Sequence, residues 1–187
     1  MDVGGIVLGP DQPIVGWRYW QMSRTGRLRS VTQKWIEWQP SHPLRAVCLE
    51  IHHPAPAAGC NCGVYATRDF ATLRDHGLCL VPGVPIVVGQ VALWGEVVTD
   101  DASWRAAFGR PQSLSLVEAT VGEEKLDQAL ADLERYGVAV NLVSMDEAIG
   151  GASATMLTFQ AMSLKTSRLA PPVGRPVDRP GGMPTPA

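Results

Sequence analysis

Three cysteines and two histidines are crowded into one short stretch of this chain: Cys48, His52, His53, Cys60 and Cys62. Thiolate sulfur and imidazole nitrogen are the ligands that zinc prefers, and a structural zinc site usually has four ligands in a tetrahedron. The sequence therefore predicts a metal site formed by Cys48, His53, Cys60 and Cys62. His52 is the alternative to His53, because neighbouring residues on an extended segment point in opposite directions and only one can face the ion.

The residues around the paired cysteines favour a stiff approach followed by a tight turn. Pro54 and Pro56 stiffen the approach, because each proline fixes φ and removes a backbone donor. Glycines flank the Cys60–Asn61–Cys62 segment on both sides. Their freedom to adopt φ > 0 lets two thiols that are one residue apart face a single ion.

Two other interpretations of this stretch stay open at the level of sequence. Cys48 could be a small buried residue, with the histidines on a loop. The cysteines could instead form a disulfide or redox pair, although a Cys60–Cys62 disulfide would close a strained small ring. Cys79 lies in an apolar run and is predicted to belong to the core.

The candidate ligands favour a structural zinc over a catalytic one. Four protein ligands close a zinc site, whereas three leave a position for water. The chain contains neither the H-E-x-x-H motif of metalloproteases nor the paired motifs of zinc deaminases. No acidic residue follows the histidines at helical spacing to serve as a general base.

Composition sets limits on the class of protein. Sixteen basic and 18 acidic residues give a net charge of −2, so no overall basic field attracts the chain to nucleic acid. No apolar run is long enough to span a membrane, and the first residues lack the basic and apolar regions of a secretory signal. Cysteines arranged as ligands fit a reducing compartment, so we expect a cytoplasmic protein.

Hydrophobic periodicity predicts an α+β fold that is rich in strands. Apolar alternation and glycines within strands are typical of a partly closed, barrel-like sheet. Leucines at helical spacing after acidic residues, with Gly137 at the end, predict the clearest helix. The first strand is expected to begin near residue 16, and further strands are expected over 28–38, 44–51, 86–98 and 138–143. Helices are expected over 64–76 and 123–136, and another is expected to begin at 145.

These elements are expected to form a single α+β domain over residues 14–164. Its β-rich part, residues 14–118, carries the Cys/His metal turn, and residues 119–164 form a helix–strand–helix appendage. Residues 1–13 are expected to be a loose N-terminal lead. Residues 170–187 are rich in Pro, Gly and Arg with little apolar mass, which predicts a disordered tail.

Aromatic and basic residues are interleaved near the N-terminus and suggest a binding surface. Aromatic rings that stack on bases, next to basic groups that contact phosphates, are typical of single-stranded nucleic-acid binding. The alternative is that the tryptophans fill a small core, because Trp is highly buried on average. The candidate partner-binding residues are Trp17, Arg18, Trp20, Trp35, Trp38 and Trp94.

The order of these motifs resembles a family of uncharacterised actinobacterial and actinophage proteins over roughly residues 16–140. The residues that carry the resemblance are Gly16-Trp17-Arg18, Trp20, Leu28, Trp38, Ala46, Cys48, His53, Cys60, Cys62-Gly63, Tyr65-Ala66, Gly89, Leu93-Trp94-Gly95, Arg105-Ala106 and Tyr136-Gly137-Val138. The resemblance implies a cytoplasmic bacterial or phage protein and no particular activity. The region around Trp94 is also similar to strands of PUA-like or ASCH barrels, which often bind RNA or modified bases.

Three hypotheses of function follow. The sequence favours a non-enzymatic binding module, stabilised by zinc, that recognises a protein or nucleic-acid partner. The first alternative is a metal-dependent hydrolase acting on nucleic acid or a nucleotide, which needs an open metal position and a nearby acid such as Glu50. The second is a structural or assembly protein, a homodimer in which the tryptophan-bearing strands are buried against a second copy.

Overall fold

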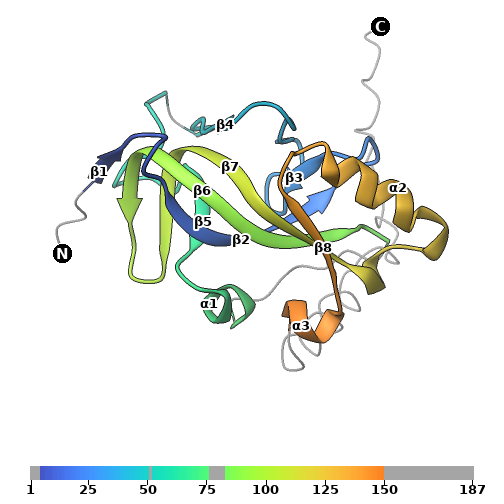
Figure 1. The fold of residues 1–187 in the computed structure, drawn as a ribbon. Helices are drawn as coiled ribbons and strands as arrows, with labels where there is room; N and C mark the ends of the chain where they lie inside the picture. Colours follow the sequence, from blue (N-terminus) through green and yellow to red (C-terminus); the bar gives the residue numbers. More distant parts are fainter. Residues whose placement is uncertain (1–4, 51, 76–82, 150–187) are drawn as a thin grey trace, which may run out of the picture.

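The computed structural model describes residues 5–50, 52–75 and 83–149. Its described part is dominated by strands, and the few helices lie at the outside of the sheet (Figure 1). The strands are β1 (Gly5–Leu8), β2 (Ile14–Met22), β3 (Leu28–Ser30), β4 (Leu44–Arg45), β5 (Val64–Thr67), β6 (Ile86–Thr99), β7 (Ser103–Val117) and β8 (Ala139–Val143). The helices are α1 (Phe70–Asp75), α2 (Glu123–Glu134), α3 (Met145–Ile149) and the 3-10 turn η1 (Glu118–Thr120).

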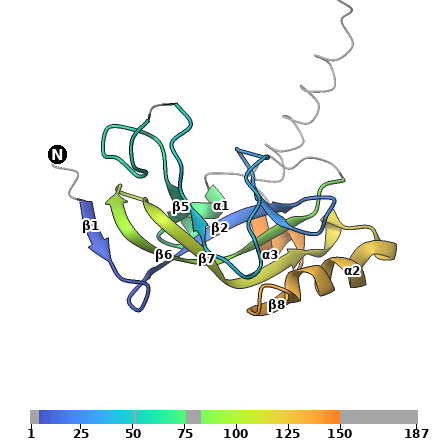
Figure 2. The same ribbon diagram turned by 90° about the horizontal axis from the view of Figure 1, so that it is seen from above.

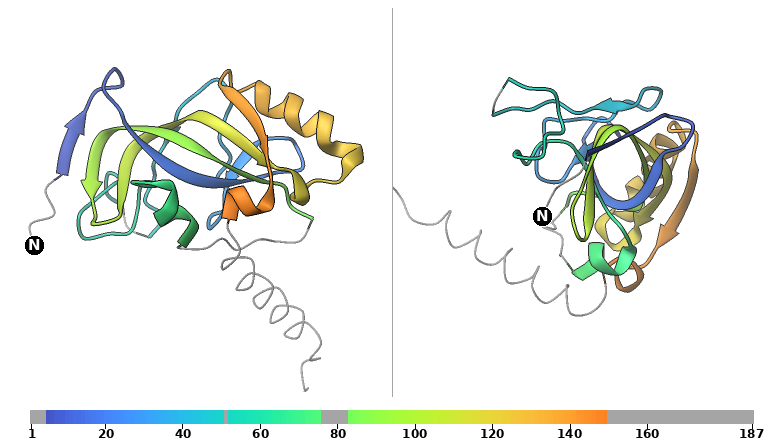
Figure 3. Two further views of the ribbon diagram at one scale, coloured as in Figure 1. Left: turned by 60° about the horizontal axis from the view of Figure 1, so that its bottom comes forward. Right: turned by 90° about the vertical axis from the view of Figure 1, so that its left-hand side faces the viewer.

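Four strands form a ring that is only partly closed, as the sequence predicts. β6 pairs with β2 and with β7, and β5 pairs with both β2 and β7. The β2–β5 closure consists of one residue pair, Trp17 and Thr67, so the sheet is not a continuous barrel. Figure 3 (right) shows the strands curling around this ring when it is viewed from the side.

Gly16 permits the close approach of β2 and β5. A Cβ atom at this position would lie 2.7 Å from the carbonyl oxygen of Thr67 and 2.8 Å from the Cβ of Ala66. Both distances are shorter than van der Waals contact. A side chain here would therefore push the two strands apart and open the ring.

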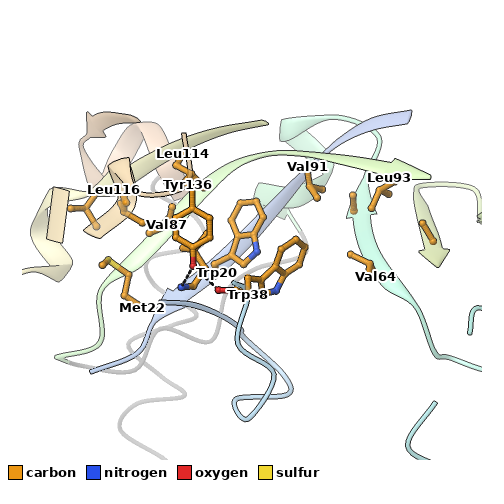
Figure 4. Close-up of a cluster of buried hydrophobic side chains, with 14 of the residues drawn as sticks. Trp20, Met22, Trp38, Val64, Val87, Val91, Leu93, Leu114, Leu116 and Tyr136 are labelled. Atoms are coloured by element: carbon orange, nitrogen blue, oxygen red, sulfur yellow. Dashed lines mark hydrogen bonds between the residues drawn. The ribbon is translucent and has the colours of Figure 1, made fainter. Parts of the chain in front are cut away.

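The main core is formed by side chains of the ring strands, β3 and α2 (Figure 4). Trp20 and Trp38 meet edge to face at 5.6 Å between ring centroids. The Tyr136 hydroxyl accepts a hydrogen bond from the backbone N–H of Leu28 (2.8 Å) and donates one to the carbonyl of Trp38 (2.8 Å). Leu133 of α2 is fully buried in the same cluster, so helix and sheet share one core.

The helix–strand–helix appendage is also confirmed. α2 lies along the sheet at one end of the molecule, and β8 then pairs with β7 in a parallel ladder (Figure 2). Ser144 and Glu147 exchange side-chain and backbone hydrogen bonds at the start of α3 and so form a capping box. None of the helices in the described part of the chain is long and apolar enough to cross a membrane.

Two predicted strands are shorter than expected. Residues 28–38 fold back on themselves, because Trp38 N–H bonds to the Leu28 carbonyl (2.8 Å) and only Leu28–Ser30 pairs with β2. In the predicted strand 44–51, regular pairing ends at β4. The last bond to β7 is from Ala46 N–H to the Ala107 carbonyl (2.8 Å), and the chain then leaves the sheet.

Two other expectations also differ from the structure. The N-terminal lead includes β1, which pairs antiparallel with β6 from Gly5 to Leu8. The helix expected over 64–76 is wrong for residues 64–67, which form β5 with the alternating burial of a strand. The described helix, α1, begins at Phe70 after Asp69 caps Thr72 N–H (2.7 Å). Cys79, the part of the predicted appendage beyond residue 149 and the predicted tail lie outside the described residues.

Candidate metal centre

The four predicted ligands come together in the segment between β4 and β5, which projects from the sheet (Figure 2). The ligand atoms of Cys48, His53, Cys60 and Cys62 all lie within 4.8 Å of one another. Cys48 Sγ and Cys60 Sγ are 3.7 Å apart, and Cys62 Sγ is 3.9 Å from His53 Nε2. The group could hold a metal ion.

The distance between the sulfur atoms of the cluster fits ligands of a tetrahedrally coordinated ion better than a disulfide. Sulfur atoms about 2.3 Å from a central zinc, at tetrahedral angles, lie about 3.8 Å from each other. The 3.7 Å between Cys48 Sγ and Cys60 Sγ is close to that value and far longer than a disulfide bond of about 2.05 Å. Cys60 and Cys62 are free thiols.

The geometry selects His53 over His52. His53 Nδ1 lies 2.7 Å from the carbonyl oxygen of Pro54, to which Nδ1–H donates in the tautomer that leaves Nε2 unprotonated. Nε2 then carries its lone pair toward Cys62. Histidine ligands commonly have this outer hydrogen bond, which fixes the ring and the tautomer. His52 is exposed and is not part of the cluster.

Arg105 on β7 holds the turn that carries Cys60 and Cys62. Its Nη1 donates to the carbonyls of Ala57 (3.2 Å), Cys60 and Cys62 (3.2 Å). Its Nε donates to Asp100 (3.3 Å) at the β6–β7 turn, and the arginine is buried. A residue far along the chain thus fixes the backbone of the candidate ligands, which the local motif did not reveal.

The backbone at the turn also depends on Gly63. Its φ is +130°, a conformation that residues with a side chain rarely adopt. A Cβ there would lie 3.0 Å from the Cβ of Arg105. Gly63 therefore allows the chain to pass close to Arg105 as it leaves Cys62 and enters β5.

The two thiols of the turn differ in acidity. A hydrogen bond from the backbone N–H of Cys62 is the main cause that lowers the pKa of the Cys60 thiol. Burial is the main cause that raises the pKa of the Cys62 thiol. The structure therefore favours the thiolate form, which binds metals, first at Cys60.

A cavity of about 910 Å³ lies beside the cluster. Cys48, Cys60 and Cys62 line it, so one wall of the cavity belongs to the candidate metal centre. Trp35 lines it too and is 71% exposed. The cavity was not foreseen from the sequence, because its walls come from segments that meet only in the folded chain.

The six candidate partner-binding residues are in different environments. Trp20 and Trp38 are 0% and 1% exposed in the core, so the prediction that they contact a partner is wrong. Their aromatic rings fill the space between the ring of strands and α2, which was the alternative interpretation. Trp94 stacks on Phe108 at 5.9 Å between centroids, on the β6–β7 hairpin away from the cavity lining.

The remaining three candidates, Trp17, Arg18 and Trp35, all line the cavity. Trp17 is partly buried and packs against Phe70, with 5.0 Å between ring centroids. Trp35 lies on the exposed turn between β3 and the returning chain. Three of the six candidate partner-binding residues therefore line one cavity.

Comparisons with protein-family models, with curated proteins and with solved structures give no match to this chain. Function is therefore inferred from the geometry of the cluster and of the cavity beside it.

Proposed function

We propose that this protein is a zinc-stabilised binding module, in which Cys48, His53, Cys60 and Cys62 hold one zinc ion and the cavity beside them receives a partner. The observation that supports it is the grouping of four soft ligands within 4.8 Å of one another, at the wall of a cavity of about 910 Å³. Three thiolates and one imidazole are a donor set that zinc binds in closed structural sites.

A structural role for the ion agrees with where the ligands lie. They are all in the segment between β4 and β5, residues 46–63, and the described residues of this segment contain no helix or strand. Zinc that cross-links such a segment contributes folding free energy directly. The ion would therefore hold the cavity wall in position.

The partner is proposed to be a protein or a nucleic acid that contacts the rim of the cavity. Trp35, Val47 and Leu49 line it with large exposed apolar side chains. Exposed apolar groups that cluster around a concave site commonly mark binding surfaces. Arg45, which is also exposed, adds a positive charge to the same rim.

The metal-dependent hydrolase is the second candidate, and one observation favours it. Glu50 lines the same cavity as three of the cysteines, so an acid is available near the candidate metal. Hydrolysis would require an open coordination position for water. A variant that lacks one ligand yet folds, keeps its zinc and hydrolyses a nucleotide would favour this candidate over the binding module.

Metal content tests the proposal, with the two histidines as a matched pair. The protein is purified without a histidine tag, and zinc per chain is measured by plasma mass spectrometry for wild type, His53→Ala and His52→Ala. We expect one zinc per chain in wild type and in His52→Ala, and less in His53→Ala, because only His53 belongs to the cluster. Wild-type protein without zinc, or equal zinc in the two variants, would contradict the proposal.

A further inference from the structure

Arg18 is a half-buried cation that has no acidic partner among the described residues. Its Nη1 donates to the carbonyl of Tyr65 (2.6 Å) and its Nη2 to Ser30 Oγ (3.0 Å). Its Nε is closed off from solvent and makes no hydrogen bond. The guanidinium also lies over the ring of Trp38, 5.3 Å from the centroid.

These contacts satisfy the guanidinium only in part. A guanidinium has five N–H donors, and the bonds to Tyr65 and Ser30 use two of them. Burying a charge is costly unless an opposite charge or a full set of hydrogen bonds compensates. Burial lowers the pKa of Arg18 to about 10, so the side chain stays charged at neutral pH without a protein anion.

The open side of Arg18 faces the cavity beside the candidate metal centre. Arg18 and its hydrogen-bond partner Ser30 line the cavity. The other charged residues that line it, within the described part of the chain, are Arg45 and Glu50. Arg45 and Glu50 are exposed and can be hydrated, whereas Arg18 is half-buried and its Nε is closed off from solvent. The cavity therefore has a cationic interior and the apolar rim of Trp35, Val47 and Leu49.

We propose that this cavity binds a ligand that carries an oxyanion, a phosphate or a carboxylate, on an apolar body. The oxyanion accepts hydrogen bonds from the remaining N–H groups of Nη1 and Nη2 of Arg18, and the apolar body packs against Trp35. This inference deepens the proposed function, because it specifies what the same cavity binds, and it does not require the metal to be zinc. Arginine suits the role because its planar fork of donors matches both phosphate and carboxylate.

The first experiment compares charged and neutral probes on the wild-type protein. Binding of phenyl phosphate, benzoate and benzyl alcohol is followed by ligand-observed NMR titration. We expect saturable binding of at least one anion with a dissociation constant on the order of 1 mM or tighter. Benzyl alcohol, which has a similar ring and no charge, should bind about tenfold more weakly or worse. The anion that binds more tightly shows whether the cavity prefers a phosphate or a carboxylate. Equal binding of all three probes would overturn the proposal.

The second experiment compares two arginines of the same cavity. Arg18→Met and Arg45→Met remove the same charge, one from the interior and one from the rim. We expect Arg18→Met to lose the preference for the anion about tenfold or more, and Arg45→Met to keep most of it. Equal effects of the two variants would mean that only general electrostatic attraction operates, which would contradict the proposal.

Zinc content and thermal midpoint, measured on the same preparations, separate this inference from the proposed function. Anion binding that depends on Arg18 in a protein without zinc would support the inference and overturn the metal proposal. Anion binding that Arg18→Met leaves unchanged would overturn the inference even if zinc is present, because the anion would then be held elsewhere, for example by the metal. If Arg18→Met does not fold, Arg18→Lys keeps the charge without the planar fork, and unchanged binding by that variant would contradict the forked contact.

Discussion

Replacing Arg105 should release the turn that carries Cys60 and Cys62. Its Nη1 bonds to three backbone carbonyls of this turn, and a nitrogen with two hydrogens can satisfy two of them fully at any moment. A hydrogen bond to a charged group contributes about 1.5–3 kcal/mol, so two contribute about 3–6 kcal/mol at most. The turn is partly exposed, and water can hydrate the freed carbonyls, which places the loss near the lower limit.

The ion pair with Asp100 adds little to this figure. The Asp100 side chain is 43% exposed, and pairs of this kind contribute about 0–1 kcal/mol. We therefore expect Arg105→Met to lower the free energy of unfolding by about 3 kcal/mol. Because Arg105 orients the backbone of two candidate ligands, zinc affinity should also fall about 10- to 100-fold.

The assay combines urea unfolding, followed by tryptophan fluorescence, with competition for zinc against a chromophoric chelator. Arg110→Met is the matched control, because Arg110 lies on the same strand and is exposed. Arg110→Met should change the free energy of unfolding by less than about 0.5 kcal/mol and leave zinc affinity unchanged. If Arg105→Met behaves like Arg110→Met in both measurements, the positioning role of Arg105 is refuted.

Three further predictions concern the core and the ring. Tyr136→Phe leaves two buried backbone groups without their hydroxyl partner, which should lower the free energy of unfolding by about 2 kcal/mol or more in urea titrations. Burial raises the pKa of Tyr19 to about 12 from 10.0, so the unfolded chain ionises first and stability falls as pH rises from 10 toward 12. The difference between the urea midpoints at about pH 8 and about pH 11 should therefore be smaller in Tyr19→Phe than in wild type. Gly16→Ala should lower the free energy of unfolding by about 1–3 kcal/mol, because the added methyl group pushes β2 away from Thr67. Hydrogen exchange should then show weaker protection of the β5 amides. Gly9→Ala is the control and should leave stability unchanged, because a Cβ at Gly9 has no atom within 4 Å.

The candidate ligands could be predicted from the sequence because they are local. All four belong to one segment, and their residue types alone indicate the chemistry. The choice between His52 and His53 needed the structure, because it depends on the contact between His53 Nδ1 and the carbonyl of Pro54. Helix α2 was also predictable, since its leucine spacing and its glycine stop are local signals.

What could not be predicted depends on pairing between distant segments. β7 extends over Ser103–Val117, yet Gly109 and Pro111 interrupt its apolar pattern, so the sequence does not predict a long strand there. Pro111 is tolerated because it lies where the register between β6 and β7 shifts, away from a regular ladder. The position of Arg105 under the metal turn follows from the β5–β7 pairing, which no sequence period reveals.

The dependence on metal should be concentrated in the cavity wall and not in the sheet. Residues 46–63, of which Ile51 is not described, contain no helix or strand in their described part, and Val47 and Leu49 are exposed. Ordering a residue's backbone costs about 1–2 kcal/mol, and this segment buries little apolar surface to offset that cost. The ring of strands packs around Trp20 in a core that it shares with α2 and that contains none of the candidate ligands, so it needs no such support. Removing the metal should therefore loosen the binding cavity first and leave the ring folded, because the candidate ligands connect parts of the segment to each other and not the strands of the sheet.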